Sequence, residues 1–515
     1  MREPRRTFVH GAAVLAFGSL TSRVLGAVYR FLLPWIMGGG RAAQEGVGLF
    51  SMAYPIYLSV LGIATSGFPI AISKLVSEKL ALGQKEEASQ IFRRALYLLG
   101  GMGGLATLFL FFLAPLYARF VAHDPRATLS LQAIAPAIFL VSLLGGYRGL
   151  FIGLQEMIPC AVSLVLEQAV RISSLLLLAA LLLPRGIEWS AAGANFGAVI
   201  GAVVAFLFLL RISRGRLPPQ PVSWSDFWPE ARRLFAFAFP ISLAGAIYSL
   251  LGFLDALIVP SRLHVAGLGR ESTRLYGILA GYAMPFLTLA GAVMYPLATS
   301  LIPALAEKLA LGDRPSALRR WRTALRLAML FGFPASLGLG MLSTEIPQLL
   351  FRSPEAGRPL LFLAPAMLFV SLEIVSAGAL QALGKPLLLF RNVALAGTVK
   401  ALLSWTLTSL PAVNVTGAAL ATSAASLIAA GLNLRELEKD LGPFPWKAVT
   451  KPLLSALAMA AGVQGSLSLL SPVLGPDLAT VGSMALGGLL YGLLLLATGE
   501  VRREELLGFL RLRLR

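Results

Sequence analysis

Long apolar segments follow one another along almost the whole chain of 515 residues. The stretches 100–115 and 173–184 contain no charged residue. A helix that spans a bilayer needs about 20 mostly apolar residues, and about fourteen such segments can be counted. Charged residues make up 13% of the chain, about half of their usual share in a soluble domain. The sequence therefore predicts an all-α polytopic membrane protein with no separate soluble domain.

The expected spans lie near 8–37, 46–73, 91–115, 128–152, 158–183, 190–212, 234–260, 275–303, 324–343, 358–383, 386–411, 413–434, 448–471 and 478–498. Arginines precede the first apolar run, as in a secretory signal. That run is too long for a signal's apolar region and contains Arg23 and Arg30. We therefore expect it to be a permanent helix.

The net charge of +19 raises the question of nucleic-acid binding. Most of the 44 Lys and Arg lie at the termini and in the loops that follow even-numbered helices. Positively charged loops stay in the cytoplasm, so both termini are expected to be cytoplasmic. The basic residues thus indicate topology and contact with anionic membrane lipids rather than nucleic acid.

A hexapeptide, Glu-Lys-Leu-Ala-Leu-Gly, occurs at 78–83 and again at 307–312. The same offset aligns Arg93 with Arg322 and Arg171 with Lys400. An offset of six helices predicts two parallel six-helix lobes, which in transporters enclose a central site. We expect an N-lobe at 1–212, a cytoplasmic linker at 213–233 and a C-lobe at 234–437, followed by two extra helices and a basic tail at 438–515.

The sequence gives little support for a metal site or a catalytic triad. Cys160 is the single cysteine, and the three histidines, His10, His123 and His264, lie far apart in sequence. No ligand spacing resembles a metal site. We expect no metal, no cofactor and no catalytic residue.

Ionisable residues inside spanning helices are costly and usually face a cavity or a partner. Arg23 and Arg30 share one helical face, and their helix offers no carboxylate. Such a pair suits a phosphate, which arginine binds through a bidentate fork. Alternatively, Arg30 extends to the interface, or both pair with carboxylates elsewhere.

Glu167 and Arg171 lie four residues apart, so they either form a structural pair or contribute to the site. Lys400, the repeat mate of Arg171, has Ala396 at the corresponding place and is a candidate anion ligand.

Three more residues complete the candidates. Asp255 either binds a coupling ion, Na⁺ or H⁺, or forms a salt bridge across the lobes, and Glu373 is a similar candidate. Arg148 either lines a gate that contacts substrate or anchors its helix at the cytoplasmic surface.

Several motifs point to a family. They include Met-Ala-Tyr-Pro-Ile-Tyr at 52–57, the segment 67–83, Tyr-Arg-Gly-Leu-Phe-Ile-Gly-Leu-Gln at 147–155 and Glu-Gln-Ala-Val-Arg-Ile at 167–172. Together they resemble the stage V sporulation protein B and polysaccharide-biosynthesis branch of the multidrug/oligosaccharidyl-lipid/polysaccharide (MOP) exporter superfamily. The segment Ser22-Arg23-Val24-Leu25-Gly26 with Arg30 is also similar to the first-helix motif of MurJ lipid II flippases, with the second arginine one residue later.

The resemblance implies a flippase in a bacterial cell membrane that moves an undecaprenyl-pyrophosphate-linked saccharide such as lipid II, with cell-wall synthesis enzymes as partners. A MATE-type cation or drug antiporter is the alternative, and it would require carboxylates in the cavity. A membrane enzyme acting on the same lipids is a third alternative, and it would require a clustered acid, base or metal.

Overall fold

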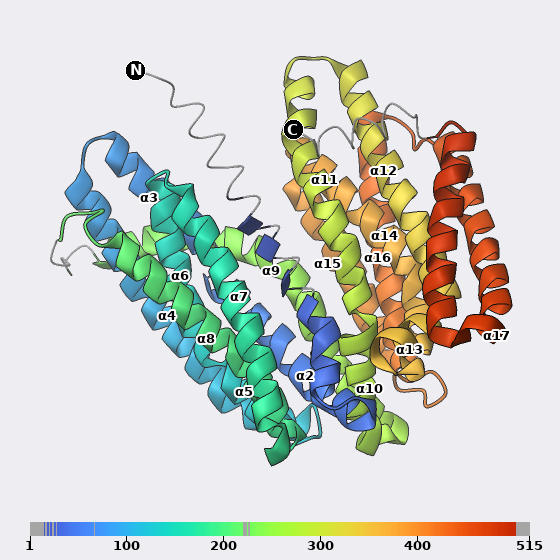
Figure 1. Cartoon of the computed structure of the whole chain (residues 1–515). Coiled ribbons are helices and arrows are strands. Elements are labelled where there is room, and N and C mark those ends of the chain that lie inside the picture. Colours follow the sequence, from blue (N-terminus) through green and yellow to red (C-terminus); the bar gives the residue numbers. More distant parts are fainter. Residues whose placement is uncertain are drawn as a thin grey trace. The chain divides into compact units, whose positions relative to one another are not determined.

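The chain folds into helices throughout the part that the structure, a computed structural model, describes (Figure 1). Described are residues 15, 18, 19, 21, 22, 25, 26, 28–65, 67–219, 224 and 227–500, with the backbone alone at 240, 241, 243–248 and 447. No strand occurs within these ranges. The all-α prediction is confirmed.

Eleven of the described helical segments are long and apolar enough to cross a membrane. Two of them, 249–310 with 62 residues and 448–497 with 50, are each long enough for two crossings. The second bends at Gly475, which has a φ of 75°, and Figure 1 shows α17 (Lys447–Ala497) folding back on itself there. With the partly described segment before Gly40, the count agrees with the predicted fourteen or so.

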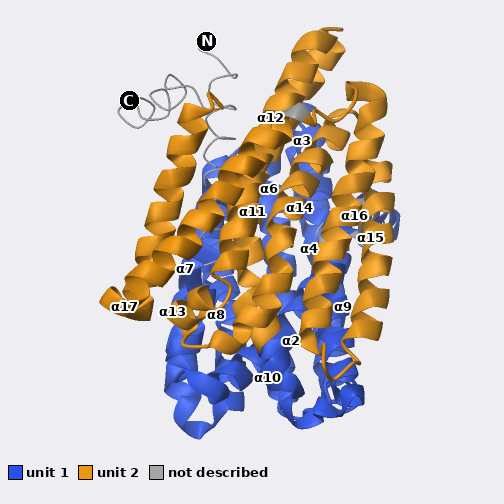
Figure 2. Cartoon of the chain, turned by 90° about the vertical axis from the view of Figure 1, so that its right-hand side faces the viewer, with its two compact units in different colours: residues 1–277 blue, residues 278–515 orange. Residues whose placement is uncertain are grey.

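The chain forms two compact units, Met1–Gly277 and Ile278–Arg515 (Figure 2). Unit 1 contains α2 (Gly40–Thr65), α3 (Phe68–Ala81), α4 (Lys85–Phe120), α5 (Ala127–Ile134), α6 (Pro136–Gly153), α7 (Met157–Leu182), η1 (Leu183–Arg185), α8 (Ile187–Ser213), α9 (Phe227–Leu263), η2 (His264–Leu268), η3 (Gly269–Glu271) and α10 (Ser272–Gly277). Unit 2 contains η4 (Ile278–Ala283), α11 (Pro285–Ala310), α12 (Arg314–Met341), α13 (Glu345–Phe351), η5 (Pro354–Ala356), α14 (Gly357–Ala382), α15 (Pro386–Leu407), α16 (Val415–Leu441) and α17.

The division of the chain falls after α10 because α9 packs against α2 and α3 in unit 1. The sequence repeat would instead begin its second copy at α9. The lobe and linker boundaries, which were drawn from the repeat, therefore remain a prediction.

The repeated hexapeptide has the same local structure in both units. Gly83 and Gly312 follow helices α3 and α11 with φ of 77° and 69°, a region that favours glycine. The residue after each glycine closes the same turn with a backbone hydrogen bond. The Gln84 amide donates to the Lys79 carbonyl at 2.9 Å, and the Asp313 amide donates to the Lys308 carbonyl at 3.0 Å. The repeat is therefore structural as well as sequential.

Glycines at helix crossings repeat as well. A methyl group added at Gly149 would lie 2.7 Å from the carbonyl oxygen of Pro69, and one at Gly378 would lie 3.0 Å from that of Ala298. Both contacts are related by the same offset. Small residues let helix backbones approach closely inside a membrane, so each unit places α6 or α14 against its neighbour in this way.

The two hydrophobic cores also use matching positions. Unit 1 buries its core between α3, α4, α6 and α8, and unit 2 between α11, α12, α14 and α16. The matched buried pairs include Ile72 and Leu301, Val76 and Leu305, Phe92 and Trp321, Leu99 and Ala328, and Phe151 and Leu380. The same register of packing therefore builds both units.

Candidate functional site

A buried arginine on α7 lies among tyrosines in unit 1. Arg171 is 7% exposed, and its guanidinium carbon lies 4.7 Å from the ring centroid of Tyr54 and 5.9 Å from that of Tyr29. The Tyr57 ring lies 5.9 Å from the Tyr54 ring. Among the described residues, no carboxylate forms an ion pair with Arg171. The arrangement holds a cation inside the membrane by aromatic faces, which leaves its charge available to an anion.

Close packing of α8 against α7 fixes the position of this arginine. A methyl group added at Gly201 would lie 2.6 Å from the Glu167 carbonyl oxygen and 2.8 Å from the Arg171 Cβ. Any larger residue at 201 would push α7 away. The contact at Gly201 thus sets how closely α8 approaches the backbone that carries Arg171.

Glu167 pairs with Arg148 rather than with Arg171. The Arg148 Nη2 donates to the Glu167 carboxylate at 2.7 Å, and both side chains are about 15% exposed. The Arg148 Nε donates to the Ser163 hydroxyl at 3.0 Å, which itself donates to the Cys160 carbonyl at 2.7 Å. The helical spacing of Glu167 and Arg171 had left a self-neutralised pair open. The structure instead satisfies Glu167 from α6.

Of the two first-helix arginines, Arg30 alone is among the described residues. Arg23 lies outside the described residues. Arg30 follows Tyr29 in the helical stretch 28–36, is partly buried and forms no ion pair with a described residue. A methyl group at Gly26 would lie 3.7 Å from the Gln168 side-chain oxygen, so this segment runs beside α7 close to Arg171.

Asp255 is a buried carboxylate on α9, 8% exposed. It lies close enough to Tyr276 of α10 for their side chains to interact electrostatically. Tyr117 of α4 donates its hydroxyl proton to the neighbouring Ala256 carbonyl at 2.7 Å. Three helices of unit 1 thus surround this carboxylate, and its role as an ion site or salt-bridge partner remains a prediction.

Unit 2 contains a further pair of buried charged residues. Glu373 on α14 is 8% exposed and Lys400 on α15 is 5% exposed, and the charge of Lys400 acts on the Glu373 carboxyl. Ala396 had suggested that Lys400 lacks a carboxylate, but the neighbouring carboxyl comes from another helix. Nearby, Asn392 donates to Asn433 at 3.0 Å, which donates to the Ser376 hydroxyl at 3.2 Å.

A polar cluster at the other end of unit 1 escaped the sequence analysis as a site. Arg126 forms ion pairs with Asp124 and with Glu45, both at 2.9 Å, and the Thr273 hydroxyl donates a hydrogen bond to Asp124 at 2.7 Å. Burial alone would raise the pKa of the Asp124 carboxyl, but the bonds from Arg126 and Thr273 outweigh it and hold that pKa below its usual value. The cluster ties the α4–α5 loop to α2 and α10.

No group of three or more His, Cys, Asp or Glu residues that could hold a metal is present in the described ranges. His123 and His264 do stack on one another, with ring centroids 3.9 Å apart.

The sequence analysis also missed the tyrosines around Arg171 as site residues. Their signal was available, since Tyr54 and Tyr57 stand one helical turn apart, but nothing in the sequence placed them against α7.

The fold defines a class of membrane protein. It resembles "Lipid II flippase MurJ, inward closed conformation" with a TM-score of 0.69 and 17% identity, over 94% of this chain and 98% of that one. It also resembles an inward-facing multidrug resistance MATE family transporter of the MOP superfamily, with a TM-score of 0.61 and 14% identity over 82% and 99%. The chain is a multi-pass membrane protein with the fold of MOP-type transporters.

The family is shown by the sequence as well. The model "Polysaccharide biosynthesis protein" matches residues 8–308, and the chain belongs to this family. It is 30% identical to stage V sporulation protein B of Bacillus subtilis, over 98% of this chain and 97% of that protein. It is 26% identical to the lipid II flippase MurJ of the same species, over 91% and 89%. Among these similar proteins, the names that state an activity are those of a lipid II flippase and a multidrug transporter.

Proposed function

We propose that this protein moves a diphosphate-linked saccharide lipid, of the lipid II type, from the inner to the outer leaflet of a bacterial membrane. The observation that carries the proposal is Arg171, a buried cation with aromatic neighbours and no carboxylate partner among the described residues. A guanidinium in such surroundings binds a diphosphate strongly, because the anion replaces missing countercharge. Arg30, and Arg23 by its sequence position, would add to the same positive field.

The direction of transport has a physical driving force. A diphosphate carries negative charge outwards through an inside-negative potential, which favours the step by about 2.3 kcal/mol per charge for each 100 mV. The chain contains no Gly-rich phosphate loop that would indicate use of ATP. In this proposal Asp255 and Glu373 bind the coupling H⁺ or Na⁺, and both termini face the cytoplasm.

The test is a leaflet-accessibility assay for lipid II in vesicles that contain this protein as the single transporter. We expect Arg171→Gln to abolish the flipping of lipid II and Arg171→Lys to retain a fraction, since lysine keeps the charge but not the fork. Arg185→Gln, at the exposed end of the same helical hairpin, is the control and should behave as wild type. Full activity of a well-folded Arg171→Gln variant would refute the proposed site.

A cation antiporter is the second candidate, and the buried Asp255 is the observation that favours it. In that case Asp255→Asn should abolish proton-linked export of a cationic dye while Arg171→Gln leaves it intact. If the protein is a flippase, neither the wild type nor either variant should export the dye.

A further inference from the structure

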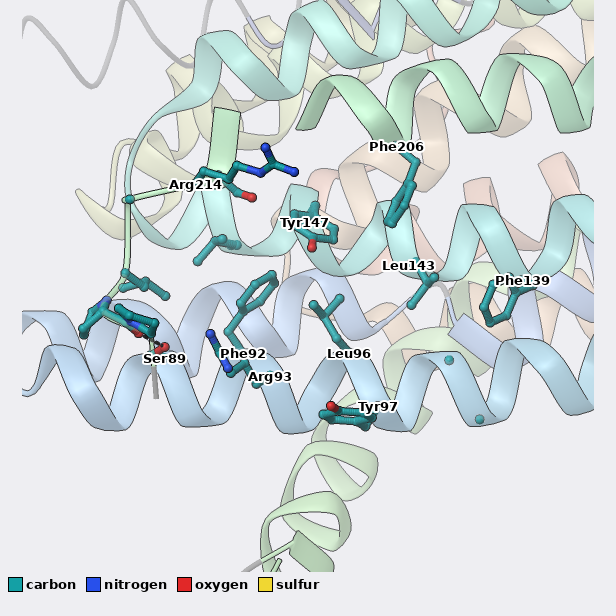
Figure 3. Close-up of a pocket in the computed structure, with 18 residues that line it drawn as sticks. Ser89, Phe92, Arg93, Leu96, Tyr97, Phe139, Leu143, Tyr147, Phe206 and Arg214 are labelled. Carbon is teal, nitrogen blue, oxygen red and sulfur yellow. Dashed lines mark hydrogen bonds between the residues drawn. The ribbon is translucent and has the colours of Figure 1, made fainter. Parts of the chain in front are cut away.

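A cavity of about 860 Å³ opens on unit 1 between α4, α6, α8 and the segment that follows α8. This volume is within the range of ligand sites. Its walls are mainly apolar and aromatic, and the residues shown in Figure 3 include Phe92, Tyr97, Tyr147 and Phe206. No carboxylate is among its lining residues. An occupant of this cavity must therefore be largely apolar.

One end of the cavity is positively charged. Arg93 and Arg214 lie near that end in Figure 3. Neither forms an ion pair within the described part of the chain, whereas their neighbours do: Arg94 pairs with Glu230, and Arg216 pairs with Glu156 at 3.1 Å. Two guanidinium groups beside an apolar cavity complement an amphiphile with a negatively charged head.

The depth of Arg93 in the membrane agrees with that of a lipid headgroup. Helix α4 carries no charge from Ala95 to Ala118, a stretch long enough to cross the hydrocarbon core. Arg93 therefore lies at the membrane interface. Tyr97, one turn deeper, packs on Trp224 with ring centroids 5.3 Å apart, and Trp224 is 61% exposed. Tyrosine and tryptophan concentrate at this level of a bilayer.

Comparison with unit 2 shows that this face is not covered in the same way. The offset of the repeat aligns Tyr97 with Arg326 and Gly101 with Leu330 on α12. In unit 2, α17 packs on that face: Tyr491 donates to the Leu330 carbonyl at 3.0 Å, and Glu500 pairs with Arg326 at 3.1 Å. In unit 1, Trp224 packs on Tyr97 instead, and a methyl group added at Gly101 would meet nothing within 4 Å. Around Gly101, the described residues of unit 1 therefore leave this surface of α4 uncovered.

The polar groups at the cavity limit what kind of lipid fits. The hydroxyl of Ser89 donates to the Pro218 carbonyl at 2.7 Å, and that of Ser213 donates to the Leu210 carbonyl at 2.9 Å. The donors left at the cavity are the two arginines and the hydroxyls of Tyr97 and Tyr147. The charge of the two arginines favours a headgroup with a phosphate over a neutral one.

We infer that this cavity binds an anionic glycerophospholipid of the inner leaflet, with its phosphate between Arg93 and Arg214 and an acyl chain along the aromatic wall. The site is separate from the Arg171 site. The inference does not depend on which substrate the protein transports.

The experiment measures retention of phosphatidylglycerol against phosphatidylcholine by native mass spectrometry of the purified full chain. Wild type should prefer phosphatidylglycerol. The double variant Arg93→Gln/Arg214→Gln should lose that preference about thirtyfold, since each interfacial arginine contributes about fivefold. Arg322→Gln, at the repeat position of Arg93 in unit 2, is the matched control and should leave the preference unchanged.

A second variant tests the apolar part without changing charge. A side chain at Gly101 begins in open space, so Gly101→Phe should fold normally while its ring fills the cavity and lowers retention of the lipid. Three results would overturn the inference: equal retention of the two phospholipids by wild type, unchanged retention by both cavity variants, or displacement of phosphatidylglycerol from this site by lipid II. Flipping of lipid II, measured in parallel, reports on the Arg171 site separately.

Discussion

The guanidinium carbon of Arg171 lies 4.7 Å from the centroid of the Tyr54 ring, so a cation on α7 is held by an aromatic face on α2. Contacts of this kind are worth from about 1 kcal/mol where exposed to about 2 kcal/mol where desolvated. We expect Tyr54→Leu to lower the flipping rate of lipid II about 5- to 30-fold. Tyr54→Phe keeps the ring and should retain most of the rate. Equal rates for wild type and Tyr54→Leu would show that the ring does not hold the arginine.

The Arg148–Glu167 pair should be structurally important. Glu167→Gln leaves the arginine buried without its countercharge, which costs about 3–5 kcal/mol in comparable pairs. We expect a clear fall in melting temperature in detergent, and partial recovery in the exchanged variant Arg148→Glu/Glu167→Arg. Glu156→Gln breaks the more exposed pair with Arg216 and should cost about 1 kcal/mol or less.

The two crossing glycines should be sensitive in the same way. Gly149→Ala and Gly378→Ala each place a methyl group within 3.0 Å of a carbonyl oxygen, so the helices must separate. Overpacking of this kind costs about 1–3 kcal/mol. Gly431→Ala on α16 meets no atom within 4 Å and should be neutral or slightly stabilising. Thermal unfolding in one detergent compares all three, and an unchanged Gly149→Ala would contradict the close crossing.

Stability should fall in mild acid because of the stacked histidines. Burial, and then the charge of His264, lowers the pKa of His123 below 6.5. The neutral form is thus favoured in the folded state. Its stabilisation is complete above about pH 6.5 and is lost as the pH falls through the lowered folded pKa. We expect the fall in melting temperature between about pH 7.5 and pH 5 to be smaller in His123→Gln. An identical fall in both proteins would exclude the histidine as its cause.

The predicted orientation can be tested with single cysteines in a Cys160→Ser background. Gln84→Cys lies in the turn after α3, and Leu410→Cys lies after α15; both positions are exposed. The distribution of basic residues predicts that Gln84 faces the cytoplasm and Leu410 the outside. A membrane-impermeant maleimide should label Leu410→Cys in intact cells and Gln84→Cys only after lysis. The reverse pattern would invert the topology.

Several features followed from the sequence by itself. The membrane class follows because a bilayer requires about 20 apolar residues for each crossing, a pattern that depends on composition and not on packing. The repeat follows because the paired residues occupy equivalent positions in both copies, as Gly149 and Gly378 do. The same offset places Arg171 and Lys400 at equivalent positions, each within a predicted span.

The tertiary structure alone decided which charges meet. Spacing along α7 made Arg171 the natural partner of Glu167, but Arg148 reaches Glu167 from α6, and the tyrosines of α2 surround Arg171. Likewise, Lys400 has its carboxyl neighbour on α14 rather than on its own helix. Helical periodicity determines which side chains share a face, whereas contacts between faces depend on how closely the helices pack. Glycines such as Gly201 allow that packing, and the partner of each glycine cannot be read from the sequence.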